Sequence, residues 1–129
     1  MSTMTDEERI KHYKAYLAAF NAKSYEGIKS YIHPDCTANF RGKRLAHSRE
    51  DMLPTYPAHW EKMPSPIELR EIRPIKDGVW TMLRNTDDGN DVEVEYFYNE
   101  EGLFIHHNII DAKSFATKES EDGVTSDVQ

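Results

Sequence analysis

Four segments in the second half of the chain have the composition and periodicity of β-strands. They cover residues 67–75, 79–85, 92–98 and 103–111, and Gly, Asp and Asn fill the turns between them. A period of two is typical of strands that bury one face. Because the turns are short, neighbouring strands are expected to run antiparallel. This half of the chain therefore predicts a four-stranded sheet.

The chain begins with the pattern of two helices. Thr5 or Asp6 can cap the first helix, whose apolar residues recur at helical spacing: Ile10, Tyr13, Leu17 and Phe20. A second, shorter helix is expected to begin at Ser24 and to be stopped by Pro34. Both helices precede every expected strand.

Two short strands and a third helix follow in the sequence. Residues 36–40 and 43–46 are typical of strands that flank a turn at Gly42. The third helix is expected over residues 49–63 with Ser48 as its cap, and Pro54 and Pro57 must bend or break it. The basic cluster of residues 41–44 is too small to indicate a nucleic-acid site and fits a hairpin turn.

Composition limits the classes of partner. The formal net charge of −7 argues against nucleic acid, whose phosphates require clustered Lys and Arg. No stretch approaches the roughly 20 apolar residues of a membrane span, and the N-terminus lacks the apolar core of a secretory signal. Cys36 is the single cysteine, so no internal disulfide is expected. We therefore expect a cytoplasmic protein that binds neither nucleic acid nor membrane.

The order of elements predicts an α+β fold. Three N-terminal helices are expected to pack against a curved, mostly antiparallel, cone-shaped sheet, and to leave a pocket between helices and sheet. Residues 1–116 are expected to form a single domain. Residues 117–129 are polar and acidic, which is typical of a disordered tail.

Two stretches carry a resemblance to a known superfamily. Residues 16–40, YLAAFNAKSYEGIKSYIHPDCTANF, and residues 101–115, EGLFIHHNIIDAKSF, resemble the opening and closing elements of nuclear transport factor 2-like proteins. Within that superfamily the chain is similar to SnoaL-like and ketosteroid isomerase-like enzymes. The resemblance implies the cone-shaped fold, and it leaves the reaction open because the superfamily includes isomerases, cyclases, dehydratases and non-catalytic modules.

The resemblance transfers only part of the known catalytic machinery. Tyr16 stands five residues before Asn21, the place of an oxyanion-hole tyrosine in ketosteroid isomerase. Phe40 stands at the position of that enzyme's general base, and Val94 at the position of its second oxyanion donor. Ile109 takes the place of the aspartate base of SnoaL-like cyclases. The resemblance therefore argues against those carboxylate mechanisms.

Alternation decides which of two adjacent histidines faces the pocket. Ile105, His107 and Ile109 share one face of the last strand, and the resemblance implies that this face looks into the cone. His106 then shares the outer face with Phe104 and Asn108. Phe97 would join this outer face from the neighbouring strand. Because such a face is too apolar for free solvent, a homodimer through the outer sheet face is expected.

The expected pocket combines an imidazole with tyrosine hydroxyls. His107 is the candidate for proton transfer, Tyr16 and Tyr96 are candidates for stabilising an oxyanion, and Asp35 is a candidate to orient a base. The remaining candidates would contact substrate: Tyr98, Trp60, Trp80, Met82, Arg84, Phe40, Tyr56, Ile105 and Ile109. On residues 79–85 the inward set is expected to be Trp80, Met82 and Arg84, although the alternate set is also buriable.

These candidates predict a cofactor-independent acid/base enzyme. It would isomerise, cyclise or dehydrate a hydrophobic oxygenated metabolite such as a polyketide or terpenoid, in secondary metabolism. The alternative is a non-catalytic binding or dimerisation module of the same fold. An epoxide hydrolase would need an inward Asp-Arg-Asp set, of which only Arg84 is available. No metal is expected, since His106 and His107 lie on opposite faces and Cys36 lacks a Cys partner.

Each candidate also has a purely structural interpretation. His107 can fill a packed core by hydrogen bonding to Tyr16 or to a backbone carbonyl. Tyr96 and Tyr98 can be ordinary strand residues, because tyrosine favours strands. Asp35 follows His33 and Pro34, and an HPD tripeptide also marks chaperone J-domains. Those domains are all helical, so the strand pattern that follows favours a turn here.

Overall fold

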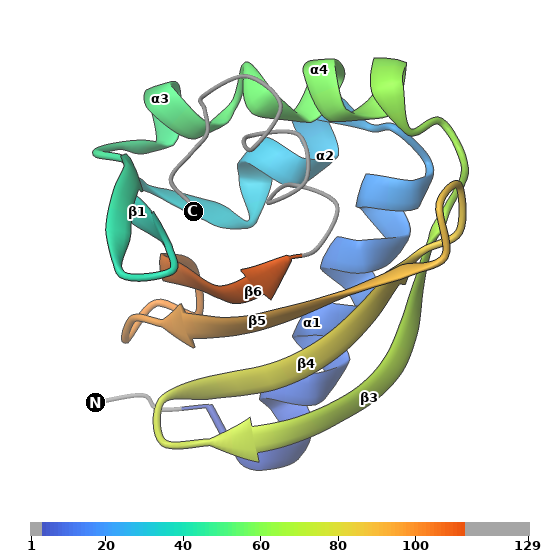
Figure 1. Ribbon diagram of the computed structural model, residues 1–129. Helices are drawn as coiled ribbons and strands as arrows, with labels where there is room; N and C mark the ends of the chain where they lie inside the picture. The colour runs from blue at the N-terminus through green and yellow to red at the C-terminus, as the bar shows by residue number, and fades with distance from the viewer. Residues whose placement is uncertain (1–3, 113–129) are drawn as a thin grey trace.

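The computed structural model describes residues 4–112 (Figure 1). The expected tail, residues 117–129, lies outside the described residues. Helix α1 (Asp6–Asn21) crosses one face of the long strands, and the other helices gather at one end of the sheet. The predicted α+β fold, with helices against a curved and mostly antiparallel sheet, is confirmed.

The first helix begins as the sequence predicts. The Thr5 hydroxyl accepts a hydrogen bond from the Glu8 backbone N–H at 3.1 Å, and the Glu8 carboxylate accepts one from the Thr5 N–H at 2.8 Å. This reciprocal capping satisfies two backbone donors at the start of α1. The helix buries one stripe against the sheet: Tyr13, Tyr16, Leu17 and Phe20. Two of these residues contribute hydroxyls to the interior.

Helix α2 (Tyr25–Ser30) is shorter than predicted. Ser24 caps it, with its hydroxyl accepting from the Gly27 N–H at 3.1 Å. The prediction that the helix continues to Pro34 is wrong, because strand β1 (Ile32–Phe40) already begins at Ile32. Backbone pairing of Ile32 with Phe104 of the last strand takes precedence over the helical spacing of the apolar residues.

Proline breaks the third helical stretch into two helices. Helix α3 (Arg49–Met52) follows a cap at Ser48, and helix α4 (Thr55–Lys62) follows Pro54. Pro57 lies in the first turn of α4, where its missing N–H removes no intrahelical hydrogen bond. Helices α3 and α4 therefore form a bent cover at one end of the sheet (Figure 1).

All strands belong to one sheet with the order β2-β1-β6-β5-β4-β3. The further strands are β2 (Lys43–Ala46), β3 (Ile67–Ile75), β4 (Gly78–Asn85), β5 (Asn90–Tyr98) and β6 (Phe104–Ala112). Strands β1 and β6 run parallel, and the other neighbours run antiparallel. The inner face of the sheet and α1 enclose the core. Within residues 4–112, no helix has both the length and the apolar character that a membrane crossing needs.

Candidate functional site

Strand register arranges the inner face of the sheet in layers. Residues directly opposite each other on paired strands share a face. Tyr96 of β5 lies opposite His107 of β6, which in turn lies opposite Ala38 of β1. The next layer contains Val94 of β5, Ile109 of β6 and Phe40 of β1. The layer after that contains Val92 of β5 and Leu83 of β4. A polar layer is therefore followed by two apolar layers.

The inner face is closed at the end beyond His107. Phe104 is fully buried there, and its ring stacks on Tyr98 with centroids 4.8 Å apart. The Tyr98 hydroxyl lies 3.0 Å from Nδ1 of His12 on α1. Tyr98 is thus part of the packed base of the cone and does not line the space in front of His107.

A cavity of about 500 Å³ lies between the inner face, α1 and α4. Of the predicted site residues it is lined by Tyr16, Phe40, Tyr56, Tyr96, His107 and Ile109. His107 therefore faces the cavity, and His106 faces outward, where its Nδ1 lies 2.7 Å from the Thr37 hydroxyl. A volume of this size is in the range of small-molecule sites.

Four polar side chains meet at the deep end of the cavity. The hydroxyls of Tyr16 and Tyr56 lie 3.1 Å apart, which joins α1 to α4. The ring of Tyr96 lies against His107 with centroids 4.7 Å apart, and the Tyr16 ring is 6.2 Å from His107. Behind them the Tyr13 hydroxyl donates to the Tyr96 hydroxyl at 3.4 Å. One imidazole and several hydroxyls thus surround a single end of the cavity.

Burial keeps this cluster uncharged near neutral pH. Desolvation, with a smaller contribution from His106, lowers the pKa of His107 to about 3. Desolvation also raises the pKa of Tyr96 to about 12, and it raises the pKa values of Tyr16 and Tyr56. Nε2 of His107 is buried and has no hydrogen-bond partner within residues 4–112. The imidazole is therefore neutral, with one ring nitrogen unused by the fold.

The predicted inward set on β4 is wrong. Thr81 lies opposite Val94 and Leu83 opposite Val92, so the alternate set faces in. The three predicted residues, Trp80, Met82 and Arg84, lie on the outer face. There the Trp80 indole N–H donates to Glu93 at 2.7 Å, and Arg84 donates to Asp91 at 3.0 Å.

A bulge overturns the facing predicted for the start of β6. Tyr98 lies opposite Phe104 but Phe97 lies opposite His106, so Ile105 is an extra residue on its strand. The bulge turns Phe104 into the core, against the prediction that it faces outward. Ile105 is half-buried and does not line the cavity.

Two other candidates also lie away from the cavity wall. Asp35 has a largely exposed side chain near His33, so the structure does not place it where it would orient His107. Trp60 packs against Phe20 and Tyr56 behind the wall of the cavity. The expected turn at Asp35 is wrong, because β1 already begins at Ile32 and Asp35 lies within it; Trp60 is on the expected helical segment but points away from the cavity.

The remaining wall comes from residues that the sequence analysis did not select for the site. They are mostly apolar: Phe20, Ala38, Leu45, Ala46, Met52, Thr55, Ala58, His59, Lys62, Met63, Ile67, Leu83, Asn85, Val92 and Val94. The helical spacing of Thr55, Ala58, His59 and Lys62 was the available signal, because it puts them on one side of α4.

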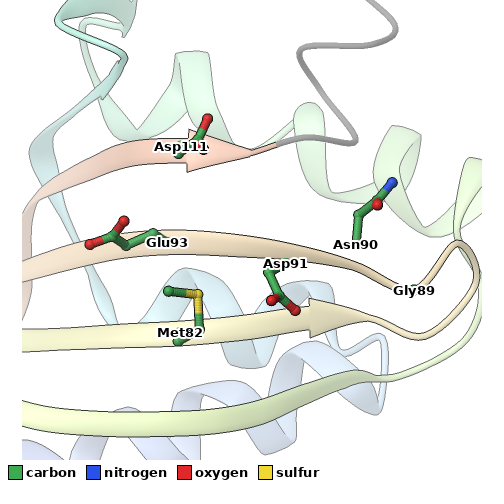
Figure 2. Close-up of a pocket in the computed structure, with 6 residues that line it drawn as sticks. All are labelled: Met82, Gly89, Asn90, Asp91, Glu93 and Asp111. Atoms are coloured by element: carbon green, nitrogen blue, oxygen red, sulfur yellow. The ribbon is translucent and has the colours of Figure 1, made fainter.

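A second, smaller hollow of about 250 Å³ lies on the outer face of β4, β5 and β6 (Figure 2). Its acidic side chains already have partners: Arg84 for Asp91, Trp80 for Glu93, and Arg41 for Asp111 at 2.5 Å. Residues 4–112 contain no group of three or more His, Cys, Asp or Glu side chains arranged around a common metal position. These acidic residues therefore stabilise the outer face by pairing.

Solved structures share this architecture. A SnoaL-like protein of unknown function from Burkholderia thailandensis matches with a TM-score of 0.74 and 12% identity, over 86% of this chain and 98% of its own. The chain has the SnoaL-like fold. No protein-family model matches the sequence, and no curated protein does.

Two further structures with this fold have more informative descriptions. IdmH from Streptomyces antibioticus, a candidate polyketide cyclase, matches with a TM-score of 0.65 and 17% identity, over 91% of this chain and 99% of its own. Rv0760c from Mycobacterium tuberculosis, in complex with estradiol-17β-hemisuccinate, matches with a TM-score of 0.66 and 14% identity, over 82% of this chain and 95% of its own. At these identities the likeness establishes the fold.

Proposed function

We propose that the cavity binds a hydrophobic, oxygenated small molecule and that the protein isomerises, cyclises or dehydrates it by acid/base chemistry without a cofactor. The observation that carries the proposal is the unpaired Nε2 of His107, which is buried in the wall of a 500 Å³ cavity beside tyrosine hydroxyls. An unsatisfied buried nitrogen has a desolvation cost that a packed core residue would avoid. A ligand oxygen or an acidic C–H group would give it a partner.

The proton transfer requires a neutral imidazole and a stabilised oxyanion. Nε2 of His107 takes a proton from a carbon next to a carbonyl; the electron pair of that C–H bond forms a C=C bond, and the π pair of the C=O bond moves onto the oxygen. Hydroxyls of Tyr16 and Tyr96 then donate hydrogen bonds to the enolate. The pKa of His107, lowered by burial, makes it a weak base in the empty cavity. The enolate formed beside it favours the imidazolium, so the two charges stabilise each other.

The residues of the cavity wall and the solved structures with the same fold support one class of substrate. Apolar layers cover most of the cavity, and the tyrosine hydroxyls and the His107 imidazole are gathered at its deep end. A polyketide or terpenoid with fused rings and a carbonyl fits this distribution. IdmH, a candidate polyketide cyclase of the same fold, supports this class and a role in secondary metabolism. The steroid derivative bound by Rv0760c supports a polycyclic ligand.

A non-catalytic binding module is the second candidate. It is favoured by Phe40, Val94 and Ile109, which line the cavity where related enzymes have catalytic groups. With these three side chains apolar, His107 is left as the principal proton acceptor of the deep end. Binding without turnover would follow if its basicity stays too low when a ketone is bound.

Exchange of α-protons distinguishes the two candidates before the natural substrate is identified. β-Tetralone, a bicyclic ketone, is incubated in D₂O with the full chain, and deuterium incorporation is followed by mass spectrometry. We expect exchange faster than in buffer, reduced roughly 100-fold or more by His107→Ala. His106→Ala is the matched control, because this neighbouring histidine faces outward. Exchange that survives His107→Ala would remove His107 from the mechanism, and binding without exchange would favour the module.

A further inference from the structure

The cavity changes character from its deep end to its mouth. Beyond the layer that contains Tyr96 and His107, the β5 wall continues with Val94 and Val92. Four residues of strand separate Tyr96 from Val92, which at about 3.3 Å per residue is roughly 13 Å. The apolar section is therefore long enough for an elongated ring system.

The exposed residues of the cavity wall lie on β2 and along α4, and Lys62 is the last residue of that helix. Six residues separate Tyr56, which contacts Tyr16 at the deep end, from Lys62, so about 9 Å of helix axis lies between them. Ser65, just beyond α4, donates from its N–H and its hydroxyl to Asp87 in the β4–β5 turn, at 2.8 Å each. That turn directly follows Asn85, the last residue of β4, which lies beyond the layer of Leu83 and Val92. The wall formed by the sheet and the wall formed by α4 therefore run from the deep end in the same direction, and Lys62 lies at the outer end of the α4 wall.

Lys62 is the charged side chain of the cavity wall. Burial lowers the pKa values of His59 and His107, and no carboxylate or guanidinium lines the cavity as the structure describes it. Lys62 is exposed and makes no ion pair with any residue in the range 4–112. A lone ammonium beside a low-dielectric cavity attracts a negative group on whatever fills it.

The two acidic groups that act on His59, a neighbour of Lys62 on α4, belong to the β4–β5 turn and are already engaged. Asp87 holds Ser65, and Asp88 accepts from the Asn90 N–H at 2.9 Å. Both carboxylates act to raise the pKa of His59, although burial has the larger, opposite effect. His59 lies near Lys62 on the same side of α4, and neither carboxylate lines the cavity. They compete for Lys62 only through solvent, where exposed charges interact weakly.

We propose that the ligand is an elongated amphiphile with an anionic group, a carboxylate or an equivalent, held at the mouth by Lys62 while its neutral oxygen lies at the Tyr16, Tyr96 and His107 end. The inference rests on the proposed function only in requiring that the cavity is the ligand site. It makes Lys62 a specificity-determining residue that orients the ligand and takes no part in proton transfer.

Two fluorescent probes with the same ring body test the proposal. Anilinonaphthalene sulfonate carries an anion, and phenylnaphthylamine is its neutral counterpart. We expect the full chain to bind the anionic probe about 3- to 10-fold more tightly at low salt. In Lys62→Gln this preference should fall to about 1, with binding of the neutral probe unchanged. Lys14→Gln, an exposed charge change on α1, should leave the preference intact.

A cavity-filling variant separates the failure of this inference from the failure of the proposed function. Ala38→Phe places a ring beside His107 and should abolish binding of both probes, with folding checked by circular dichroism. If Ala38→Phe blocks the probes but Lys62→Gln keeps the preference, or if the wild type has no preference, the inference is overturned and the proposed site stands. If Ala38→Phe leaves binding of the probes unchanged, or if neither probe binds the wild type, the cavity is not the ligand site. That result would overturn both the inference about Lys62 and the proposed function.

Discussion

The hydroxyl groups of Tyr16 and Tyr56 meet at 3.1 Å across the cavity although 40 positions separate them in the chain. This contact is the hydrogen bond by which α4 reaches the deep end of the cone. Both hydroxyls are buried, and burial raises both pKa values, so the pair stays protonated and can donate to a ligand. The pair therefore has a structural role and a proposed catalytic one, which stability measurements can separate.

Removing either hydroxyl should destabilise the fold modestly. Tyr16→Phe or Tyr56→Phe leaves the partner oxygen buried and unpaired, so each should lower the free energy of unfolding by about 1 kcal/mol. The double variant should lose less than the sum of the two, because the same hydrogen bond is removed twice. Urea unfolding measures all three. Tyr25→Phe, at an exposed position on α2, is the control and should change little; additive losses would show that the hydroxyls do not interact.

The sequence predicted the facing of β5 because its chemistry alternates strictly. Val92 and Val94 alternate with Glu93 and Glu95, and burying a carboxylate is costly, so only one assignment is possible. Strand β4 has buriable residues on both faces, and there only the register against β5 decides. Thr81, a polar residue, faces in because it lies opposite Val94 and donates to that residue's carbonyl at 2.9 Å.

The bulge in β6 had no signal in the sequence. Apolar side chains stand at Phe104 and Ile105 alike, so alternation cannot show which of them is the extra residue. The pairing of Phe104 with both Tyr98 and Ile32 determines the outcome, and it involves residues far apart in the chain. In the same way, the cavity wall formed by α4 depends on how Pro54 directs that helix, which periodicity does not reveal.

Truncating the two residues at the bulge should have unequal effects. Phe104 is fully buried at the closed base of the cone, so Phe104→Ala should lower the free energy of unfolding by about 3–5 kcal/mol. Ile105 is half-buried on the bulge, and Ile105→Ala should cost about 1 kcal/mol or less. Chemical denaturation compares them directly. A larger loss for Ile105→Ala than for Phe104→Ala would contradict the bulge and restore simple alternation.

Burial of His107 should make stability fall in acid. Its pKa is about 3 in the folded protein against an ordinary value of 6.5, so between these pH values the unfolded chain binds a proton that the folded chain does not. Stability therefore rises with pH across this window, with a slope from His107 of up to about 1.4 kcal/mol per pH unit, and the effect levels off above pH 6.5.

The histidine contribution can be isolated by substitution. Desolvation also lowers the pKa values of His12, His59 and His106, so the wild type alone does not identify the source. Urea unfolding of His107→Gln between pH 3 and 7 should give a shallower dependence, whereas His106→Gln, which removes a less buried histidine, should change the dependence less. Identical slopes for the wild type and His107→Gln would show that His107 is not buried as described.

Dimerisation through the outer face stays a prediction, and Phe97 is the residue to test. Phe97 lies opposite His106 on that face, with ring centroids 6.1 Å apart, and both side chains are only half-buried in the single chain. Covering them would remove apolar surface from water, which stabilises an association. Trp80 already has partial cover from the Arg73 guanidinium, 4.6 Å from its ring, so the uncovered part of the face is centred on β5 and β6.

Sedimentation velocity should give a mass of twice the 15.0 kDa chain for the wild type. Phe97→Glu places a carboxylate at the centre of the face and should shift the protein to the monomer, since an unpaired charge is costly to bury in an interface. Thr86→Glu, which adds the same charge in the exposed β4–β5 turn, is the matched control and should stay dimeric. Because Phe97 lies outside the cavity, monomeric Phe97→Glu should still bind phenylnaphthylamine, so loss of the dimer is distinguishable from loss of the fold. A wild type that sediments as a monomer would contradict the predicted interface.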